Sequence, residues 1–417
     1  MERESAWRRG SVLRLPRGIL LLGLVSFLTD LSSETILPLL PLHLAALGAG
    51  GVAVGLVSGV GDAVADLLKV FAGYAGDRIG RKRPLVLAGY ALSALGKFLF
   101  PLAATWQEFL MFRPLERLGK GLRSAPRDAI ITDLADPQTL GLAFGFHRAA
   151  DTAGAIAGTV LGIALIGWMR LEIRTVLFIG AALALAAVPW LFLLREQARP
   201  SLKRPLALHI SSLPQPARRL LAVGAVFGLG KVGYMFYLLK ASGHFPGAMA
   251  TLAPLFLYLW FNLVYTVTAV PAGRWSDRSG RRPVLSAGLV VLALASLGVG
   301  FSAAVLPLIA AFGMYGVANG LLEGNFRAYL GDLSPAASRG TAMGLFQTVS
   351  GLAALAGGLA AGVLWDRLGV TAPFVWGAVL CLVAALMLSW AARPARGTGG
   401  QPSAGGQAPA RRNSATN

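Results

Sequence analysis

Cysteine is nearly absent from this chain of 417 residues, and only Cys381 is present. One thiol excludes a disulfide framework within the chain and a metal site built from several cysteines. Charged residues are also scarce, at 14% of the chain, and the 38 lysines and arginines outnumber the 19 acidic residues. A Walker A phosphate-binding loop is missing too, because GKGLRS at 119–124 lacks the upstream glycine of that motif. These absences exclude a disulfide-stabilised secreted domain and a P-loop nucleotide hydrolase.

Apolar sequence, in contrast, is abundant. Hydrophobic residues make up 55% of the chain, and the mean hydropathy of +0.63 is far above that of soluble domains. A bilayer-spanning helix needs about 20 mostly apolar residues, and about twelve such runs follow one another. They begin near Ile19, Gly51, Pro84, Phe109, Gly141, Thr175, Ala217, Ala248, Pro283, Val305, Gly340 and Thr371. These runs predict an all-α membrane protein with twelve transmembrane helices.

The basic residues lie on alternate connections between the apolar runs. They precede the first run and follow the second, sixth and eighth: Arg8, Arg9, Arg14, Arg17, Arg81, Lys82, Arg83, Arg195, Arg199, Lys203, Arg204, Arg281 and Arg282. By the positive-inside rule this pattern places both termini in the cytoplasm. We therefore interpret the net charge of +19 as a topology signal, with contact to anionic lipid as a consequence, and expect no nucleic-acid partner.

The chain also repeats itself. GYAGDRIGRKRPLVLAG at 73–89 returns as GRWSDRSGRRPVLSAG at 273–288, and GLAFGFHRAADTAG at 141–154 returns as GTAMGLFQTVSGLA at 340–353. Repeats of this size in a helical membrane protein predict two bundles that face each other across a central site. The predicted segments are a cytoplasmic N-terminal tail at 1–17, a six-helix bundle at 18–194, a cytoplasmic linker at 195–217, a second six-helix bundle at 218–392 and a disordered cytoplasmic tail at 393–417.

The most specific motif is G-x-x-x-D-R-x-G-R-[KR], which occurs twice after matching runs. Its positions are Gly73, Asp77, Arg78, Gly80, Arg81 and Lys82 in the first copy, and Gly273, Asp277, Arg278, Gly280, Arg281 and Arg282 in the second. The motif resembles the signature between the second and third helices of the major facilitator superfamily. Together with the twelve predicted helices and the basic central linker, the resemblance covers about residues 17 to 392. It implies the fold of that superfamily, with two pseudo-symmetric six-helix bundles.

The resemblance also implies a gating role for the motif. A tight turn needs glycine, and an aspartate near a helix end accepts hydrogen bonds from a neighbouring helix N-terminus or from arginine. We therefore expect Asp77 and Arg78 to form a latch that holds the cytoplasmic side shut and opens during the cycle. For both copies, Asp277 included, the alternative is a topology anchor without a gating role.

Three further stretches resemble one particular group within the superfamily. TDLSSE at 29–34, RLGKGLRSAPRDAI at 117–130 and AFGFHRAADTAGA at 143–155 resemble a group of bacterial permeases for which efflux is the usual expectation. Two positions differ from drug antiporters, because Leu115 stands where their fourth helix has arginine and Thr159 where their fifth helix has proline. The resemblance predicts a transporter and not an enzyme, and we expect neither a cofactor nor a metal ion to be part of it.

Asp30 and Glu34 lie one helical turn apart in the first apolar run. Two ionised acids facing lipid would cost roughly 5–7 kcal/mol, so both are expected to face the protein interior. A rise of about 1.5 Å per residue places Asp30 near mid-membrane and Glu34 about 6 Å further out. Pro38 and Pro41 predict a bend at the outer end of this helix. Counting along the fourth run places Arg113 and Arg117 at the same depths. We therefore predict that these arginines pair with Glu34 and Asp30.

Most of the charge within the apolar runs lies in the first half of the chain. The fourth run carries a stripe at spacings of three and four, formed by Arg113, Glu116, Arg117, Lys120, Arg123 and Arg127. The later runs carry little beyond Lys231, Glu323 and Arg327. We predict a proton and substrate pathway through Asp30, Glu34, Asp62, Arg113, Glu116, Arg117, Lys120, Arg148 and Asp151. Asp30 and Glu34 are the expected proton carriers, and the alternative is a static ion-pair network that only positions helices.

The predicted function is secondary active transport of a small organic solute by alternating access, with proton-coupled efflux as the expected mode. An importer or facilitator of an organic anion is an alternative, because the charged stripe would give the cavity a basic wall. A non-transporting membrane receptor or scaffold is the alternative from another class. The expected partners are a small-molecule substrate, protons and the lipid bilayer, and we expect a monomer in the cell membrane, the inner membrane of a bacterium.

Overall fold

The computed structural model describes residues 15–79, 81–136, 139–196, 210, 213–335 and 339–390. All regular elements in these ranges are helices. The N-terminal group of helices comprises α2 (Arg17–Ile36), α3 (Leu40–Ala46), α4 (Gly51–Ile79), α5 (Arg83–Leu99), α6 (Phe109–Leu134), α7 (Leu140–Ile163) and α8 (Ile173–Ala187). The C-terminal group comprises α9 (Gln215–Gly230), α10 (Tyr234–Ser242), α11 (Met249–Ser279), α12 (Arg281–Phe301), α13 (Val305–Asp332), α14 (Arg339–Leu368) and α15 (Ala372–Trp390). The predicted all-α architecture is confirmed.

Eleven segments of the described chain are long and apolar enough to cross a membrane. α6 has 26 residues and is the twelfth helix of membrane length, but its charged stripe makes it less apolar than the others. The twelve helical segments begin within two residues of the starts that the apolar runs predict. The predicted segment boundaries at the two tails and the linker fall largely outside the described residues, so they stay a prediction.

The first membrane segment of each group contains a break in its helix. Residues 37–39 separate α2 from α3, and residues 231–233 separate α9 from α10. The bend predicted from Pro38 is confirmed, because proline cannot donate a helical hydrogen bond. The hydroxyl of Tyr234, at the start of α10, donates to the carbonyl of Leu37 over 3.4 Å. The two breaks therefore lie against each other, one from each group.

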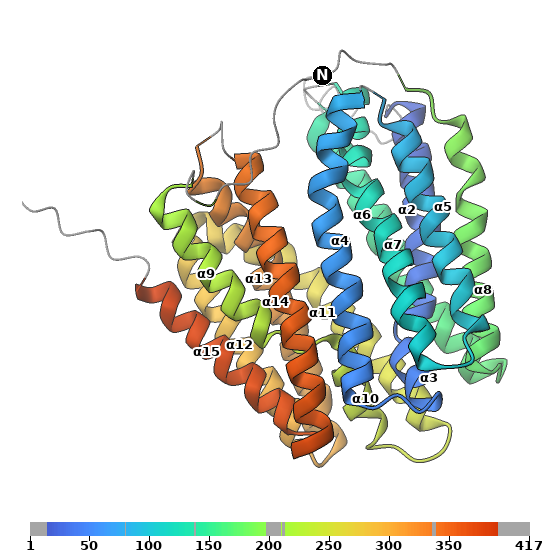
Figure 1. The fold of residues 1–417 in the computed structure, drawn as a ribbon, viewed down its shortest axis with the longest axis vertical. Helices are drawn as coiled ribbons and strands as arrows, with labels where there is room; N and C mark the ends of the chain where they lie inside the picture. The colour runs from blue at the N-terminus through green and yellow to red at the C-terminus, as the bar shows by residue number, and fades with distance from the viewer. Residues whose placement is uncertain are drawn as a thin grey trace, which may run out of the picture.

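The two groups meet along α4 and α14, which run antiparallel (Figure 1). Gly51 lies opposite Gly362 and Gly55 opposite Gly358, and the absence of side chains there lets the two backbones approach closely. We name the two ends of the molecule after α4: the Gly51 end, where α4 begins, and the Ile79 end, where it stops. The groups converge toward the Gly51 end, at the bottom of Figure 1, and diverge toward the Ile79 end.

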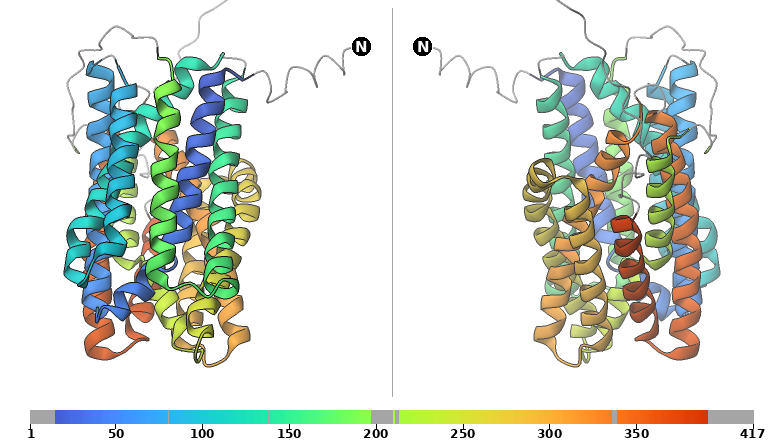
Figure 2. Two further views of the ribbon diagram at one scale, coloured as in Figure 1. Left: turned by 90° about the vertical axis from the view of Figure 1, so that its right-hand side faces the viewer. Right: turned by 90° about the vertical axis from the view of Figure 1, so that its left-hand side faces the viewer.

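Further contacts between the groups lie at the Gly51 end. There α11 packs on the end of α7, where Leu255 is a neighbour of Gly162, and α10 packs on α3. The two side views show the helices of both groups running along one common long axis (Figure 2). This arrangement leaves room for a cavity between the groups at the Ile79 end.

Candidate functional site

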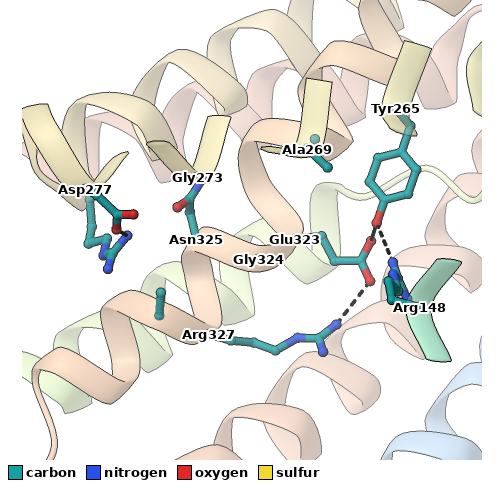
Figure 3. Close-up of a pocket in the computed structure, with 12 residues that line it drawn as sticks. Arg148, Tyr265, Ala269, Gly273, Asp277, Glu323, Gly324, Asn325 and Arg327 are labelled. Carbon is teal, nitrogen blue, oxygen red and sulfur yellow. Dashed lines mark hydrogen bonds and ion pairs between the residues drawn. The ribbon is translucent and has the colours of Figure 1, made fainter. Parts of the chain in front are cut away.

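A cavity of about 480 Å³ lies between the two groups of helices (Figure 3). Most of its wall comes from the second half of α11, between Tyr265 and Asp277, and from the last turns of α13, between Gly320 and Ala328. Arg148 of α7 completes the wall from the N-terminal group. Because α13 stops shortly before α14 begins, the cavity belongs to the Ile79 end.

A chain of polar contacts crosses this cavity from one group to the other. Arg148 Nη2 donates to the hydroxyl of Tyr265 over 3.2 Å, and that hydroxyl donates to Glu323 Oε2 over 2.6 Å. Arg327 Nη2 lies 3.0 Å from Glu323 Oε1, so both carboxylate oxygens are engaged (Figure 3). The Glu323 side chain is still 50% exposed. A solute that enters the cavity therefore meets three guanidinium groups, those of Arg148, Arg281 and Arg327, and two carboxylates, those of Asp277 and Glu323.

The two acids of α2 have different surroundings. Glu34 Oε2 accepts a hydrogen bond from the hydroxyl of Tyr258 on α11 over 2.8 Å, so this acid bridges the two groups. Asp30 has no hydrogen-bond or ion-pair partner among the described residues, and the cations that act on it through space are Lys120, Arg123 and Lys97. Both acids are partly buried. The expectation that they face the protein interior agrees with these contacts, whereas their role as proton carriers stays a prediction.

The predicted pairs of arginine with the acids of α2 are wrong. Arg113 Nη1 lies 3.0 Å from Glu116 Oε2 of the same helix, and Arg117 Nη2 lies 3.3 Å from Asp62 Oδ1 of α4. Arg113 is 1% exposed, and a buried guanidinium needs a charged partner close by. Glu116 lies three residues along the same helical face, so Arg113 reaches it without crossing to another helix.

The described contacts of the α6 stripe stay within the N-terminal group. Besides the pairs just given, Arg123 covers the ring of Tyr90 at 4.1 Å, and Arg127 Nη2 lies 2.9 Å from Asp128 Oδ1. Lys120 is partly buried, and its side chain has no hydrogen bond or ion pair among the described residues. No residue of the stripe lines the cavity described above. The basic wall that the sequence predicted from this stripe is therefore not part of that cavity.

Lys97 of α5 is a buried cation that the sequence analysis missed. Its side chain is 2% exposed, and Nζ lies 2.7 Å from Ser33 Oγ and 3.1 Å from Ser32 Oγ. A third acceptor is the carbonyl of Thr29, at 3.3 Å. All three partners belong to the α2 turn that carries Asp30. A lone lysine within an apolar run was the available signal, since a buried ammonium group requires several acceptors.

Asp151 of α7 is held by two neighbours. The hydroxyl of Ser26 on α2 donates to Asp151 Oδ1, and His147 Nδ1 lies 3.6 Å from Asp151 Oδ2. Ser26 is one turn before Asp30 on α2. Of the predicted pathway residues, Glu34 and Arg148 contact the C-terminal group directly, whereas Arg113, Glu116, Arg117 and Asp62 pair with one another within the N-terminal group.

The first copy of the predicted gating motif is only partly visible. Gly80 lies outside the described residues, and so do the side chains of Asp77 and Arg78. The burial of Gly73 is not described either, and Arg81 is exposed. Lys82 Nζ lies 2.6 Å from Asp133 Oδ2. The backbone N–H groups of Lys82 and Arg83 donate to Glu196 over 2.6 and 2.7 Å.

The second copy is described in full, and the ion pairs of its Arg281 lie within the C-terminal group. Arg281 Nη1 lies 2.6 Å from Asp277 Oδ1, and Arg281 Nε lies 3.1 Å from Asp332 Oδ2. Gly280 has a φ of 90°, a backbone angle that favours glycine, and Arg278 is exposed. Gly273 lines the cavity, and Arg282 Nε donates to the hydroxyl of Tyr329 over 2.7 Å. A gating role for either copy stays a prediction.

Comparison with known proteins agrees with this architecture. The family model of the Major Facilitator Superfamily matches the chain twice, over residues 22–259 and 220–415. An uncharacterized MFS-type transporter of Methanocaldococcus jannaschii is 37% identical over 378 residues, which are 90% of this chain and 94% of that protein. The multidrug resistance protein MdtH of Shigella boydii is 24% identical over 371 residues, covering 82% of this chain and 86% of MdtH.

Solved structures share the same fold at low sequence identity. A mutant of the nucleoside transporter NupG has a TM-score of 0.75 and 16% identity, with 90% of this chain and 100% of NupG covered. A POT family transporter in complex with 5-aminolevulinic acid has a TM-score of 0.73 and 14% identity, with 90% of this chain and 96% of that chain covered. On the family match and the similarity to the Methanocaldococcus jannaschii relative, the chain belongs to the Major Facilitator Superfamily of transporters.

Proposed function

We propose that this transporter exports a small organic solute in exchange for protons, by alternating access. One observation carries the proposal: a cavity with walls from both groups of helices lies at the Ile79 end, while the groups are packed together at the Gly51 end. Such an arrangement is one of the two states that alternating access requires. Rocking of one group against the other would close the Ile79 end and open the Gly51 end.

The acids of α2 support coupling to protons. Glu34 binds a tyrosine hydroxyl of the opposite group, and Asp30 lacks any ion-pair partner among the described residues. An acid in a low-dielectric interior is stable when protonated and costly when ionised, so its proton is released when water gains access. Because Tyr258 belongs to the other group, rocking changes the surroundings of Glu34 directly. Proton binding at Glu34 is thereby tied to the motion that moves the solute.

Export is supported by two observations. The positive-inside rule, applied to the sequence, assigns the Ile79 end to the cytoplasm, so the cavity is open to the side from which an exported solute is loaded. The relatives named multidrug resistance protein MdtH add a second argument, although their identity to this chain is low, at 24–25%. The organic-anion alternative loses part of its basis, because the α6 stripe does not line the cavity.

Reconstitution of the purified chain in proteoliposomes tests the proposal. A panel of organic solutes is screened for substrate-dependent collapse of an imposed pH gradient, and active solutes are then measured with Asp30→Asn and Glu34→Gln. We expect each variant to reduce proton-coupled flux by at least tenfold, with Glu172→Gln, an exposed acid at the start of α8, as the matched control. Wild-type flux in both variants would remove the two acids from the mechanism, and solute movement without proton movement would favour a facilitator.

A further inference from the structure

A carboxylate of the C-terminal group caps a helix of the N-terminal group. Asp366, in the last turn of α14, accepts hydrogen bonds from the first two backbone N–H groups of α4: Gly51 N lies 2.6 Å from Oδ1, and Val52 N lies 2.9 Å from Oδ2. The first turn of α4 has no acidic residue of its own. Asp366 therefore supplies the cap that α4 lacks.

Both hydrogen bonds are of a favourable kind. The first N–H groups of a helix have no partner within the helix and lie at the positive end of its dipole, so a carboxylate is stabilised there. Hydrogen bonds to an ionised acceptor are also stronger than neutral ones. In this protein the acceptor and the donors belong to different groups of helices, so the cap holds the two groups together at the Gly51 end.

The sequence around Asp366 is a third copy of the core of the repeated motif. Residues 362–369 read GVLWDRLG, which matches the G-x-x-x-D-R-x-G of 73–80 and 273–280. Gly369 has a φ of 96°, close to the 90° of Gly280 in the second copy. The first two copies stand at the Ile79 end, whereas this one stands at the Gly51 end. The motif core is therefore present at both ends of the molecule.

The antiparallel pairing gives the two ends a reciprocal arrangement. Gly51 of α4 lies opposite Gly362, and Gly55 lies opposite Gly358, so each step along α4 is matched by an equal step back along α14. Each helix of the pair carries a motif aspartate in its last turn, Asp77 in α4 and Asp366 in α14.

We propose that Asp366 is a gate residue that closes the Gly51 end, and that its hydrogen bonds to α4 break when this end opens. The inference rests on alternating access as the mode of transport. Loss of the two hydrogen bonds shifts the population toward the state in which the Gly51 end is open, because nothing else in the first turn of α4 replaces them. The motif aspartate at the opposite end of α4 would act in the opposite sense, so the two gates would alternate.

Spin-label distances on the purified protein test the gate without any substrate or proton gradient. Labels are placed at Ala45 and Leu368, two exposed positions on opposite groups at the Gly51 end, in a Cys381→Ala background that leaves no other thiol. A helix cap of this kind changes a two-state equilibrium by about five- to tenfold. We expect Asp366→Ala to raise the ratio of long to short distances by that factor, and Asp366→Asn to raise it less, because the amide oxygen still accepts one hydrogen bond.

A change to a hydrogen-bond donor on α4 distinguishes the loss of the hydrogen bond from the loss of the Asp366 charge. Val52→Pro removes one of the two donors, at a position in the first helical turn where proline is tolerated. Its effect should be smaller than additive with Asp366→Ala, because both changes remove the same hydrogen bond. Glu172→Ala removes an exposed acid whose side chain makes no capping hydrogen bond, and it should leave the distances unchanged.

Two outcomes would overturn the gate: unchanged distances in folded Asp366→Ala and Val52→Pro, or an equal shift in Glu172→Ala. If Asp366→Ala does not fold, Asp366→Asn and Val52→Pro decide the question in the same assay. The result is also separable from the proposed function. Shifted distances together with absent proton-coupled flux would keep the gate and reject the exchange with protons.

Discussion

The hydroxyl of Tyr258 lies 2.8 Å from Glu34 Oε2 and joins α11 of the C-terminal group to α2 of the N-terminal group. Tyr258 is 6% exposed, so the hydrogen bond is shielded from water. A buried carboxylate that loses such a donor remains unsatisfied, and the cost of that loss is about 1–3 kcal/mol. The state of this one hydrogen bond therefore depends both on the proton at Glu34 and on the relative position of the two groups.

Replacing Tyr258 by phenylalanine removes the donor and keeps the ring. We expect Tyr258→Phe to reduce proton-driven flux by about tenfold, which corresponds to the loss of one hydrogen bond to a charged acceptor. Flux in proteoliposomes under an imposed pH gradient measures the effect. Tyr237→Phe is the matched control, because the hydroxyl of Tyr237 bonds to Ser296 within the C-terminal group, at 2.7 Å. Equal losses in both variants would point to general destabilisation and away from coupling.

Glu323 offers a way to separate transport from stability. Its ion pair with Arg327 is half-exposed, and pairs of that kind contribute about 0–1 kcal/mol to folding. We therefore expect Glu323→Gln to leave the melting temperature within about 2 °C of the parent, while the KM for a transported solute changes at least fivefold because the side chain lines the cavity. Thermal unfolding and initial uptake rates provide the two readouts. An unchanged KM would place the solute elsewhere.

The sequence predicted the helices well because their signal is local. Apolar runs and prolines depend only on neighbours along the chain, so the starts of the twelve helical segments and the break at Pro38 followed directly from composition. The break between α9 and α10 was missed, because GKVG at 230–233 contains no proline and its glycines resemble the packing glycines found throughout the chain. Glycines alone do not distinguish a break in a helix from a close contact between two helices.

The site was harder to predict because its partners are far apart in sequence. Counting residues gives the depth of a side chain in the membrane but not the direction in which it points, so Arg113 was assigned to Glu34 although Glu116 was within reach on its own helix. Lys97 was missed because its acceptors are hydroxyls and a carbonyl, which a search for opposite charges does not reveal. Tyr265 and Glu323 lie on different helices, and no spacing relates them.

Lys97 should be replaceable by a residue of similar shape but not by a small one. Lys97→Met keeps the length of the side chain and removes the need for three acceptors, whereas Lys97→Ala leaves a buried cavity. We expect Lys97→Ala to lower the free energy of unfolding by about 2–4 kcal/mol, and Lys97→Met by less than half of that. Thermal unfolding in detergent compares the two variants. If Lys97→Met folds well yet loses proton-coupled flux, the ammonium group near Asp30 takes part in transport; retained flux limits Lys97 to packing.

Two glycine-to-alanine changes should have opposite effects on stability: Gly55→Ala, where α4 and α14 approach closely, and Gly145→Ala, on an open face of α7. A Cβ at Gly55 would collide with the carbonyl oxygen of Gly358, which is backbone and cannot rotate away. We expect Gly55→Ala to destabilise the protein by about 1–3 kcal/mol, as overpacking does, and to weaken contact between the groups at the Gly51 end.

Gly145 of α7 has no atom within 4 Å of such a Cβ. Because alanine favours helix over glycine, Gly145→Ala should instead stabilise the protein by about 0.4–1 kcal/mol. Melting temperatures of the two variants check the pair, and the spin-label distance from Ala45 to Leu368 should lengthen in Gly55→Ala alone. A stable Gly55→Ala with unchanged distances would show that the two helices do not need this close contact.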